Sequence, residues 1–453
     1  MKRSIAALAL LVAAAAMAGT TNNDDSCDIA WQPAATLLLP YFQVDFNSPP
    51  QSASQTLFTI QNVSALPQIA RVTLWTDWAF PAYSFPVFLT GYDVQPYNLY
   101  DLFANGTVVS TSVDTPIPVN PTFGSQPASN SANPNFLPDV QSGCRDVPAA
   151  LPPAFIDELR RIFTLGTTSA GCRVGATHTD AIGYITIDLV ATCAPKNATS
   201  PDYFSILLYD NVLTGDYEQL AQVGGNHYAQ GSPLVHIRAI PEGGPAGAVA
   251  ATNLPYTFYD RFTAGQPSRT IDRRQPLPSV FAPRFIAGGP GGLNTMLKIW
   301  REGVTTSNAT CSDYKNNELP FAEIVRFDEH ENATITSSGC GLGFCPGPPA
   351  APLTMAISTV LSGFLPPLST SGDAGGWLYL NLDNGGSANY STARTGYGQR
   401  GRASQGWVIT SMFAGPTYAI ETTAIALGNG CTPRAPLSSQ PGAPIGPAPN
   451  PTP

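Results

Sequence analysis

Short segments in which apolar and polar residues alternate recur along this chain, and they constrain its fold more than any other feature. Four of them are QTLFTIQN (55–62), GYITIDLV (183–190), TMLKIW (295–300) and GWVITSMF (406–413). β-Branched and aromatic residues dominate them, and Gly, Pro, Asn and Ser separate them. A period of two places every second side chain on one face of a strand. Many short strands of this kind are typical of sandwiches and barrels, so we predict an all-β protein.

One segment follows a helical period instead. In LPPAFIDELRRIFTLG (151–166) the apolar residues recur on one side of a helix, and they are Phe155, Ile156, Leu159, Ile162 and Phe163. Pro153 stands near the start and Gly166 just past the end, as helix entry and exit prefer. The sequence therefore predicts one short amphipathic helix that covers an edge or an end of a sheet.

The order of the segments divides the chain into two halves. The first half runs LLLPYFQVDF, QTLFTIQN, ARVTLWTDW, IGYITIDLV, and the second runs VFAPRFIAGG, TMLKIWRE, AEIVRFDEH, GGWLYLNLD. Chance alternation in a β protein is the competing explanation of this weak repeat. We expect two tandem β-sandwich domains, immunoglobulin-like or jelly-roll-like, over 27–242 and 250–432. The first carries a loop and helix insert over 104–171, and a disordered Pro-rich tail covers 433–453.

The first residues carry the pattern of a secretory signal peptide. Lys2 and Arg3 precede an apolar stretch, and an Ala-Met-Ala motif at 16–18 provides a small-x-small cleavage site. We predict a signal peptide over 1–18 and a mature chain that is secreted or periplasmic. No later stretch holds eighteen uninterrupted apolar residues, so no membrane span is predicted.

The eight cysteines all follow that cleavage site, in a compartment that permits disulfide bonds. They are Cys27, Cys144, Cys172, Cys193, Cys311, Cys340, Cys345 and Cys431. Zinc is the competing explanation, but the chain has no C-x-x-C knuckle and no Cys–His pair at metal spacing. We expect disulfide bonds, whose pairing stays open, and no zinc.

Acidic residues outnumber basic ones, 31 against 22, which gives a formal net charge of −9. A nucleic-acid partner requires a basic surface that neutralises phosphate. An anionic membrane likewise attracts basic segments. Neither partner is predicted for this chain.

Motifs of known catalytic chemistry are missing from the sequence. There is no G-x-S-x-G serine elbow, phosphate-binding loop or dinucleotide fingerprint, so we assign no catalytic residue and no cofactor. A glycoside-cleaving pair of carboxylates needs no motif, however. Six acidic residues remain conceivable for such a pair, although most stand where Asp favours a turn: Asp77, Asp188, Asp210, Asp216, Asp328 and Glu329.

The stretch YDNVLTGDY (209–217) is rich in oxygen ligands but lacks the spacing of an EF-hand. We interpret it as a structural turn. Asp210 and Asp216 stay a weak calcium candidate.

The stretch VTLWTDWAFPAYSF (72–85) concentrates aromatic residues. Two explanations stay open: the buried face of a sheet, or an exposed platform that stacks on sugars or on aromatic residues of a partner. The platform candidates are Trp75, Trp78, Tyr83 and Tyr97.

The strings LPYF, TLWTDWAFP, LTGYDVQ, DNVLTGDY and AQGSPLVHIRA resemble a set of uncharacterised secreted bacterial proteins over most of the mature chain. The pattern of strand, N-x-S-x-x-P and strand also resembles bacterial immunoglobulin-like modules. These resemblances imply export and a shared β-sandwich fold, and they transfer no activity.

From these observations we expect an exported, non-catalytic protein that binds a carbohydrate or a protein partner at the cell surface or in the surrounding medium. The alternative is a secreted carbohydrate-active or ester-cleaving hydrolase that uses an acidic pair. A third hypothesis is a structural subunit whose edge strands pair between chains.

Overall fold

The structure is a computed structural model, and it describes residues 31–108, 150–192, 198, 203, 206–223, 226–239, 274, 277–278, 280–286, 293–301, 323–338, 357–361, 375–382, 406–414 and 418–428. The predicted signal peptide, the Pro-rich tail and all cysteines except Cys172 lie outside the described residues. Cys172 is disulfide-bonded to a residue outside them. The pairing of the other cysteines stays a prediction.

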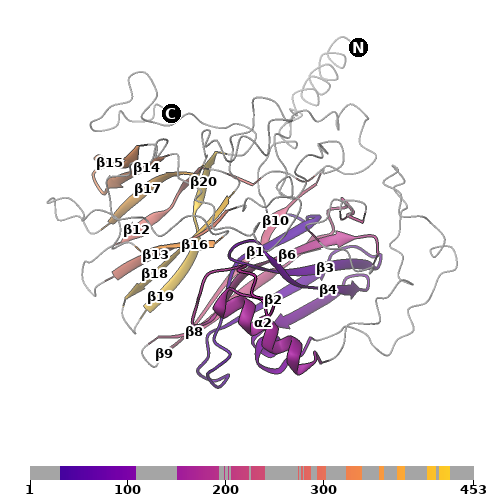
Figure 1. Ribbon diagram of the computed structural model, residues 1–453. Helices are drawn as coiled ribbons and strands as arrows, with labels where there is room; N and C mark the ends of the chain where they lie inside the picture. Colours follow the sequence, from indigo (N-terminus) through magenta and orange to yellow (C-terminus); the bar gives the residue numbers. More distant parts are fainter. Residues whose placement is uncertain are drawn as a thin grey trace, which may run out of the picture.

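The first half contains two antiparallel sheets, with strand orders β10-β1-β6-β3-β4 and β5-β2-β8-β9, and β7 pairs with β2 (Figure 1). Its elements are β1 (Thr36–Val44), β2 (Gln55–Asn62), β3 (Gln68–Thr76), β4 (Pro81–Leu89), β5 (Val94–Asn98), the π-helix η1 (Asp101–Asn105), α2 (Pro153–Leu165), β6 (Ala181–Val190), β7 (Leu213–Thr214), β8 (Asp216–Val223), β9 (Asn226–Pro233) and β10 (Val235–Ile237). The rings of Phe85 on β4 and Tyr97 on β5 meet edge to face at 5.5 Å, so the two sheets form a sandwich.

The second half also contains two antiparallel sheets, with strand orders β15-β14-β17-β11-β20 and β16-β13-β18-β19, and β12 pairs with β17. Its strands are β11 (Val280–Ala282), β12 (Arg284–Ile286), β13 (Leu293–Arg301), β14 (Glu323–Asp328), β15 (Ala333–Ser338), β16 (Ile357–Leu361), β17 (Gly375–Asn381), β18 (Gly406–Ala414), β19 (Tyr418–Thr423) and β20 (Ile425–Gly428). The predicted all-β sandwich architecture is confirmed.

The two halves have one strand topology. Replacing β1 by β11 and β12, β2–β6 by β13–β17, and β8–β10 by β18–β20 converts the strand orders of the first half into those of the second. The weak repeat in the sequence is therefore matched by the strand order. A chance repeat of alternating residues does not reproduce two sheet orders.

A threonine clamp occurs at the same place in both halves. Thr56 Oγ1 on β2 accepts the backbone N–H of Gln43 and donates to its carbonyl oxygen, at 3.1 and 3.0 Å. Thr295 Oγ1 on β13 makes the same two bonds to Ile286, at 2.8 and 2.9 Å. Each hydroxyl connects the two sheets of its own sandwich and satisfies a backbone N–H and C=O.

A close backbone approach also repeats. Gly183 on β6 pairs with Phe42, and Gly376 on β17 pairs with Phe285. A Cβ at either glycine would collide with the carbonyl oxygen of the neighbouring strand, β3 or β14. Only glycine fits both positions, which explains the Gly-aromatic entry that the sequence shows in both halves.

The hairpin turns after β3 and β14 have the same construction. Ala79 and Glu331 take the left-handed conformation, with φ of 59° and 62°. The side-chain oxygens of Thr76 and Asp328 each accept two backbone N–H groups of their own turn. Both turns are therefore stabilised by a side-chain cap at the last residue of the incoming strand.

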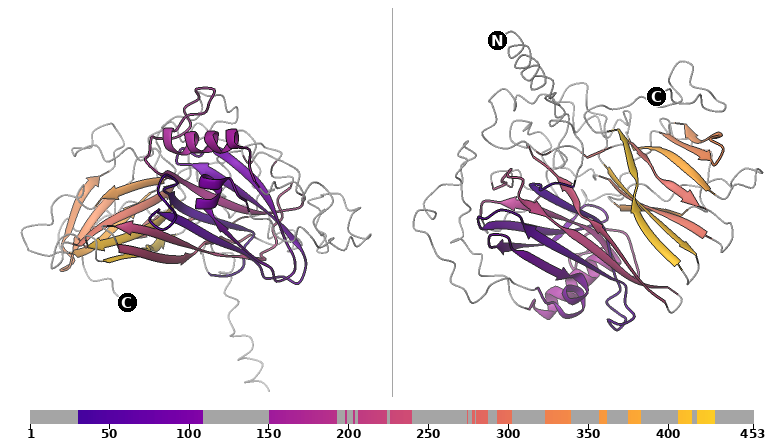
Figure 2. Two further views of the ribbon diagram at one scale, coloured as in Figure 1. Left: turned by 90° about the horizontal axis from the view of Figure 1, so that it is seen from below. Right: turned by 180° about the vertical axis from the view of Figure 1, so that it is seen from behind.

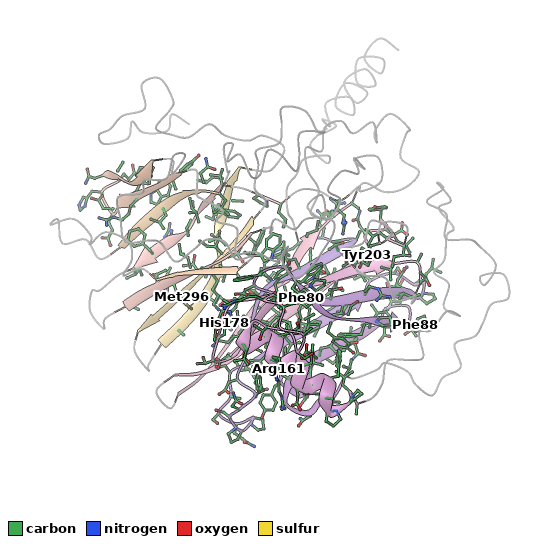
Figure 3. The ribbon with its side chains drawn as sticks, viewed as in Figure 1. Phe80, Phe88, Arg161, His178, Tyr203 and Met296 are labelled. Carbon is green, nitrogen blue, oxygen red and sulfur yellow. The ribbon has the colours of Figure 1, made fainter. Side chains whose placement is uncertain are left out.

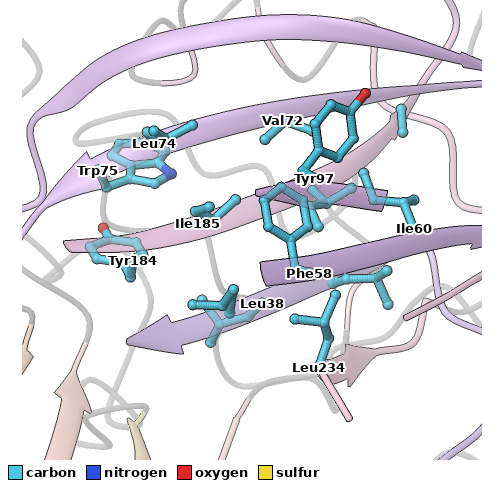
Figure 4. Close-up of a cluster of buried hydrophobic side chains, with 14 of the residues drawn as sticks. Leu38, Phe58, Ile60, Val72, Leu74, Trp75, Tyr97, Tyr184, Ile185 and Leu234 are labelled. Atoms are coloured by element: carbon cyan, nitrogen blue, oxygen red, sulfur yellow. The ribbon is translucent and has the colours of Figure 1, made fainter. Parts of the chain in front are cut away.

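The core of the first sandwich is closely packed (Figure 4). Phe58 and Tyr97 stack at 5.2 Å between ring centroids, and they belong to one buried cluster with Val72, Leu74 and Ile185 of the facing sheet. Burial of each large apolar side chain contributes about 1.5–3 kcal/mol, so this core is a main source of stability.

The helix α2 covers part of the first sandwich (Figure 2). It begins at Pro153 and ends at Leu165, and Gly166 follows with φ of 63°. This confirms the helix prediction and its left-handed glycine end. The Phe163 ring on its buried face lies 5.6 Å from the Phe42 ring. No helix among the described residues combines the length and apolar character needed to cross a membrane.

The two sandwiches contact each other through the outer face of the β16-β13-β18-β19 sheet. Trp300 on β13 is 1% exposed and packs edge-on against Tyr184 of β6, with centroids 5.7 Å apart. Two residues earlier on the same face, the Lys298 ammonium lies 4.5 Å from the Tyr41 ring centroid. The first sandwich therefore has a sheet face that the second sandwich covers.

Candidate functional site

The structure separates the four aromatic candidates. Trp75 is 0% and Tyr97 7% exposed, so neither ring offers an open face, and the platform prediction is wrong for both. Trp75 stacks on Tyr184, and its indole N–H donates to Thr186 Oγ1 at 2.8 Å. Its face of the sheet is the one that Trp300 and the second sandwich cover.

Trp78 and Tyr83 are half-buried. Tyr83 packs edge-on against Phe155 of α2, with ring centroids 5.2 Å apart, which is a core contact. Trp78 lies in the β3–β4 turn, and the guanidinium carbon of Arg173 lies 5.5 Å from its ring centroid. For these two residues a binding role stays a prediction.

Asp188 is the centre of a buried ionic cluster. Thr36 Oγ1 and the Tyr203 hydroxyl each donate to its carboxylate at 2.8 Å, and Arg274 Nη1 donates at 3.1 Å. Arg71 stands opposite Asp188 on β3, where burial lowers the pKa of the guanidinium and the nearby Tyr203 and Asp188 raise it. Asp188 is 0% exposed, so its geometry is that of a structural ion rather than a general acid or base.

Asp77 anchors the loop after α2 onto the β3–β4 turn. Its Oδ2 lies 2.9 Å from Nε2 of His178, and its carboxylate accepts the backbone N–H of Ala176. A Cβ at Gly175 would lie 2.9 Å from Asp77 Oδ1, so the loop approaches closely. His178, labelled in Figure 3, keeps 20% of its side chain exposed.

The other acidic candidates do not gather at one site. Asp328 caps its own turn, Asp216 accepts a hydrogen bond from Thr59, and Asp210 and Glu329 are exposed. The described residues contain no group of three or more His, Cys, Asp or Glu side chains that could hold a metal ion. The calcium candidate therefore gains no support from them.

Two loops interlock at one end of the first sandwich, and we call them the tip loops: 63–67 between β2 and β3, and 90–93 between β4 and β5. Asn62 joins them, because its Nδ2 donates to the carbonyl oxygens of Leu66 and Thr90 at 2.7 and 2.8 Å. Asn62 is 1% exposed, so these bonds are shielded from water. The two loops are thereby held as one preorganised unit.

The tip loops and the adjoining start of β5 expose apolar side chains. The exposed fractions are 39% for Val63, 49% for Leu66, 72% for Tyr92 and 52% for Val94. Clustered apolar exposure on a soluble protein marks interaction sites. This surface is the strongest binding candidate in the described part of the chain.

Tyr92 has an unusual backbone conformation, with φ of 58°. Bulky residues rarely occupy the left-handed region, and such strain costs on the order of 1–3 kcal/mol. The bond from the Tyr92 N–H to the Ser64 carbonyl oxygen, at 2.9 Å, helps to hold the conformation. Because the ring is 72% exposed, core packing does not explain a tyrosine here.

The polar side chains of the tip bond within it. Ser64 Oγ donates to Asn62 Oδ1 at 2.8 Å. Asp93 accepts the N–H and the hydroxyl of Thr90 at 3.0 and 3.2 Å, and the N–H of Val94 at 2.9 Å. The side chains that the tip exposes to solvent are therefore mainly apolar.

The tip could not be recognised from the sequence, because its side chains come from two loops that only the folded sandwich joins. One signal was available: the turn in LTGYDV places an aromatic residue directly after glycine, where turn chemistry alone favours Asn or Asp. No protein-family model matches the chain, and no match was found among curated proteins or solved structures.

Proposed function

We propose that this chain is an exported, non-catalytic β-sandwich protein that binds a protein partner through the tip loops. The observation that carries this proposal is the exposed apolar surface of Val63, Leu66, Tyr92 and Val94 on a backbone that buried hydrogen bonds hold in place. A preorganised surface loses little conformational entropy on binding. The signal-peptide pattern and the eight cysteines support action in a secreted or periplasmic location.

The chemistry of the tip favours a protein over a carbohydrate as its partner. A sugar site needs polar groups that reach the hydroxyls of the ligand, whereas those of Asn62, Ser64, Thr90 and Asp93 are engaged within the tip. Aromatic and aliphatic side chains, by contrast, are typical of the cores of protein interfaces.

Two of the four edge strands of the first sandwich, β4 and β5, are poorly suited to pairing between chains. The edge strand β4 contains Pro81 and Pro86, and the edge strand β5 contains Pro96. Proline removes the N–H that an added strand would need. Gln95 Nε2 also donates to the Pro96 carbonyl at 2.9 Å, so β5 carries two obstacles to strand addition.

The experiment uses the mature chain as an immobilised bait for extracytoplasmic proteins of the organism that makes it. The test variant is Leu66→Ser/Tyr92→Ser. The matched control is Ile425→Ser, because Ile425 is 67% exposed on the second sandwich. We expect wild type and control to retain the same partner, and the tip variant to bind the purified partner at least about tenfold more weakly.

If wild type and the tip variant bind the partner equally well, the tip loops are not the binding surface. Turnover of a glycan or an ester by the purified wild-type chain would favour the hydrolase alternative instead. Circular dichroism of the tip variant shows whether it is folded, so lost binding is not confused with unfolding.

A further inference from the structure

Arg173 extends from a braced segment of the loop after α2. The N–H of Thr168 donates to the carbonyl oxygen of Cys172, and that of Gly171 to the carbonyl oxygen of Thr168, both at 2.9 Å. Cys172 is disulfide-bonded, and Asp77 ties the same loop to the β3–β4 turn. Arg173 itself is exposed, so a fixed backbone presents this side chain to solvent.

Two contacts position the guanidinium. Its carbon lies 5.5 Å from the centroid of the Trp78 ring, and its Nε donates to the carbonyl oxygen of Gly175 at 3.3 Å. A cation–π contact at an exposed site contributes about 0.5–1 kcal/mol. Neither contact uses the terminal nitrogens Nη1 and Nη2.

Other surface arginines of this region are differently engaged. Arg160 donates to two backbone carbonyls of η1, and Arg161 pairs with Glu158 at 3.8 Å. Within the described residues Arg173 forms no ion pair. The Arg173 side chain is therefore held in place without a charged partner among these residues, and the N–H groups on its Nη1 and Nη2 remain available to a ligand.

The second sandwich shows that the turn does not need Trp78 for its shape. At the equivalent place His330 follows Asp328 by two residues, as Trp78 follows Thr76, and the turn keeps the same capping bonds. The indole of Trp78 is thus a feature of the first sandwich, where it supports Arg173.

We propose that Arg173, backed by Trp78, binds the carboxylate of an acidic sugar, a uronate or sialate residue of a glycan. A planar guanidinium can donate two parallel N–H bonds from its terminal nitrogens to the oxygens of one carboxylate, in a bidentate geometry. Preorganisation by the indole and the Gly175 carbonyl reduces the entropy lost on binding. This site is separate from the tip loops and does not rest on the proposed function.

The charge balance favours a single carboxylate over a polyanion. The chain carries a net charge of −9, so an acidic peptide with a charge on every residue is repelled as a whole. One positioned arginine matches one carboxylate. The half-buried indole beside it offers apolar contact for the C–H groups of a pyranose ring. An aspartate or glutamate side chain has no such ring.

The test is a calorimetric titration of the mature chain with four probes: methyl galacturonoside, which has one carboxylate, the methyl ester of this sugar, sialyllactose and lactose. We expect at least one acidic sugar to bind and both neutral probes to bind at least about tenfold more weakly, because a hydrogen bond to a charged group is lost. Arg173→Gln lowers the affinity for the acidic sugar by a similar factor. Trp78→Leu lowers it less, and Arg161→Gln, the matched control, leaves it unchanged.

Three results would overturn the proposal: no binding of either acidic sugar at millimolar concentration, equal binding of a neutral probe, or full affinity in Arg173→Gln. Binding of triglutamate alone, if it depends on Arg173, would assign the site to acidic peptides and reject the sugar. Leu66→Ser/Tyr92→Ser should bind the acidic sugar like wild type, so failure at the tip and failure at Arg173 are distinguishable.

Discussion

The rings of Trp75 and Tyr184 stack face to face, with centroids 5.8 Å apart and planes 1° from parallel. Phe327 and Trp377 form the matching pair in the second sandwich, at 4.1 Å and 6°. Each pair joins equivalent neighbouring strands, β3 with β6 and β14 with β17. An aromatic pair that both halves retain belongs to the architecture of the sheet rather than to a ligand site.

Replacing Trp75 by alanine should therefore lower stability strongly. Loss of a fully buried tryptophan costs about 3–5 kcal/mol, and the hydroxyl of Thr186 also loses the indole donor. Urea denaturation of the mature chain measures the change. Ile425→Ala, at an exposed site, should stay within about 0.5 kcal/mol of wild type. Equal stability of Trp75→Ala and wild type would contradict the burial of this ring.

The two threonine clamps should make similar contributions to the stability of the protein. Thr56→Val and Thr295→Val each keep the side-chain volume but leave a backbone N–H and a carbonyl of the facing strand without their partner. We expect each change to cost about 1–3 kcal/mol. Thermal unfolding of both variants checks this. A large loss in one and none in the other would refute the structural equivalence of the two clamps.

The strands and the helix could be predicted because their signals are local. Pro153, Gly166 and the alternating segments act over a few residues. Trp75 stacks on Tyr184, which Trp300, far away in the sequence, covers on the same sheet face. The exposure of Tyr92 likewise follows from how two loops interlock across Asn62. Burial of a given aromatic depends on such distant contacts, and alternation alone does not encode them.

The pH dependence of stability should include a contribution from His236. Burial lowers the pKa of this imidazole below its usual 6.5, while hydrogen bonds to the Gly215 and Gln32 backbones oppose the shift. The unfolded chain therefore takes up the proton first as the pH falls. The stabilisation is present above about pH 6.5 and is lost as the pH falls from there towards the lower folded-state pKa.

His236→Gln should flatten this part of the profile. Urea denaturation at a series of pH values between 7 and 5 gives the free energy of unfolding for both proteins. We expect the wild-type value to fall more steeply than that of the variant over this interval. Parallel profiles would show that His236 does not titrate differently in the folded and unfolded states.

A buried ion pair of the second sandwich lies at the junction and bonds to two residues of β8 in the first sandwich. Lys298 Nζ lies 2.6 Å from Glu421 Oε2 and 2.8 Å from Gln219 Oε1, and the two charged side chains are 7% and 3% exposed. The Tyr217 hydroxyl donates to Glu421 Oε1 at 3.1 Å. Burial, and then the nearby Glu421, raise the pKa of Tyr217 well above 10.0, so this phenol keeps the proton that it donates.

Removing one charge of this pair should lower the free energy of unfolding more than removing both charges. Glu421→Gln leaves a buried ammonium without its carboxylate, which costs about 3–5 kcal/mol. Lys298→Met/Glu421→Gln removes both charges, and the new amide oxygen still accepts from Tyr217, so we expect the double variant to be more stable than Glu421→Gln. A double-mutant cycle by urea denaturation should give a coupling of about 0.5–3 kcal/mol. Additive single effects would contradict a direct interaction between the Lys298 and Glu421 side chains.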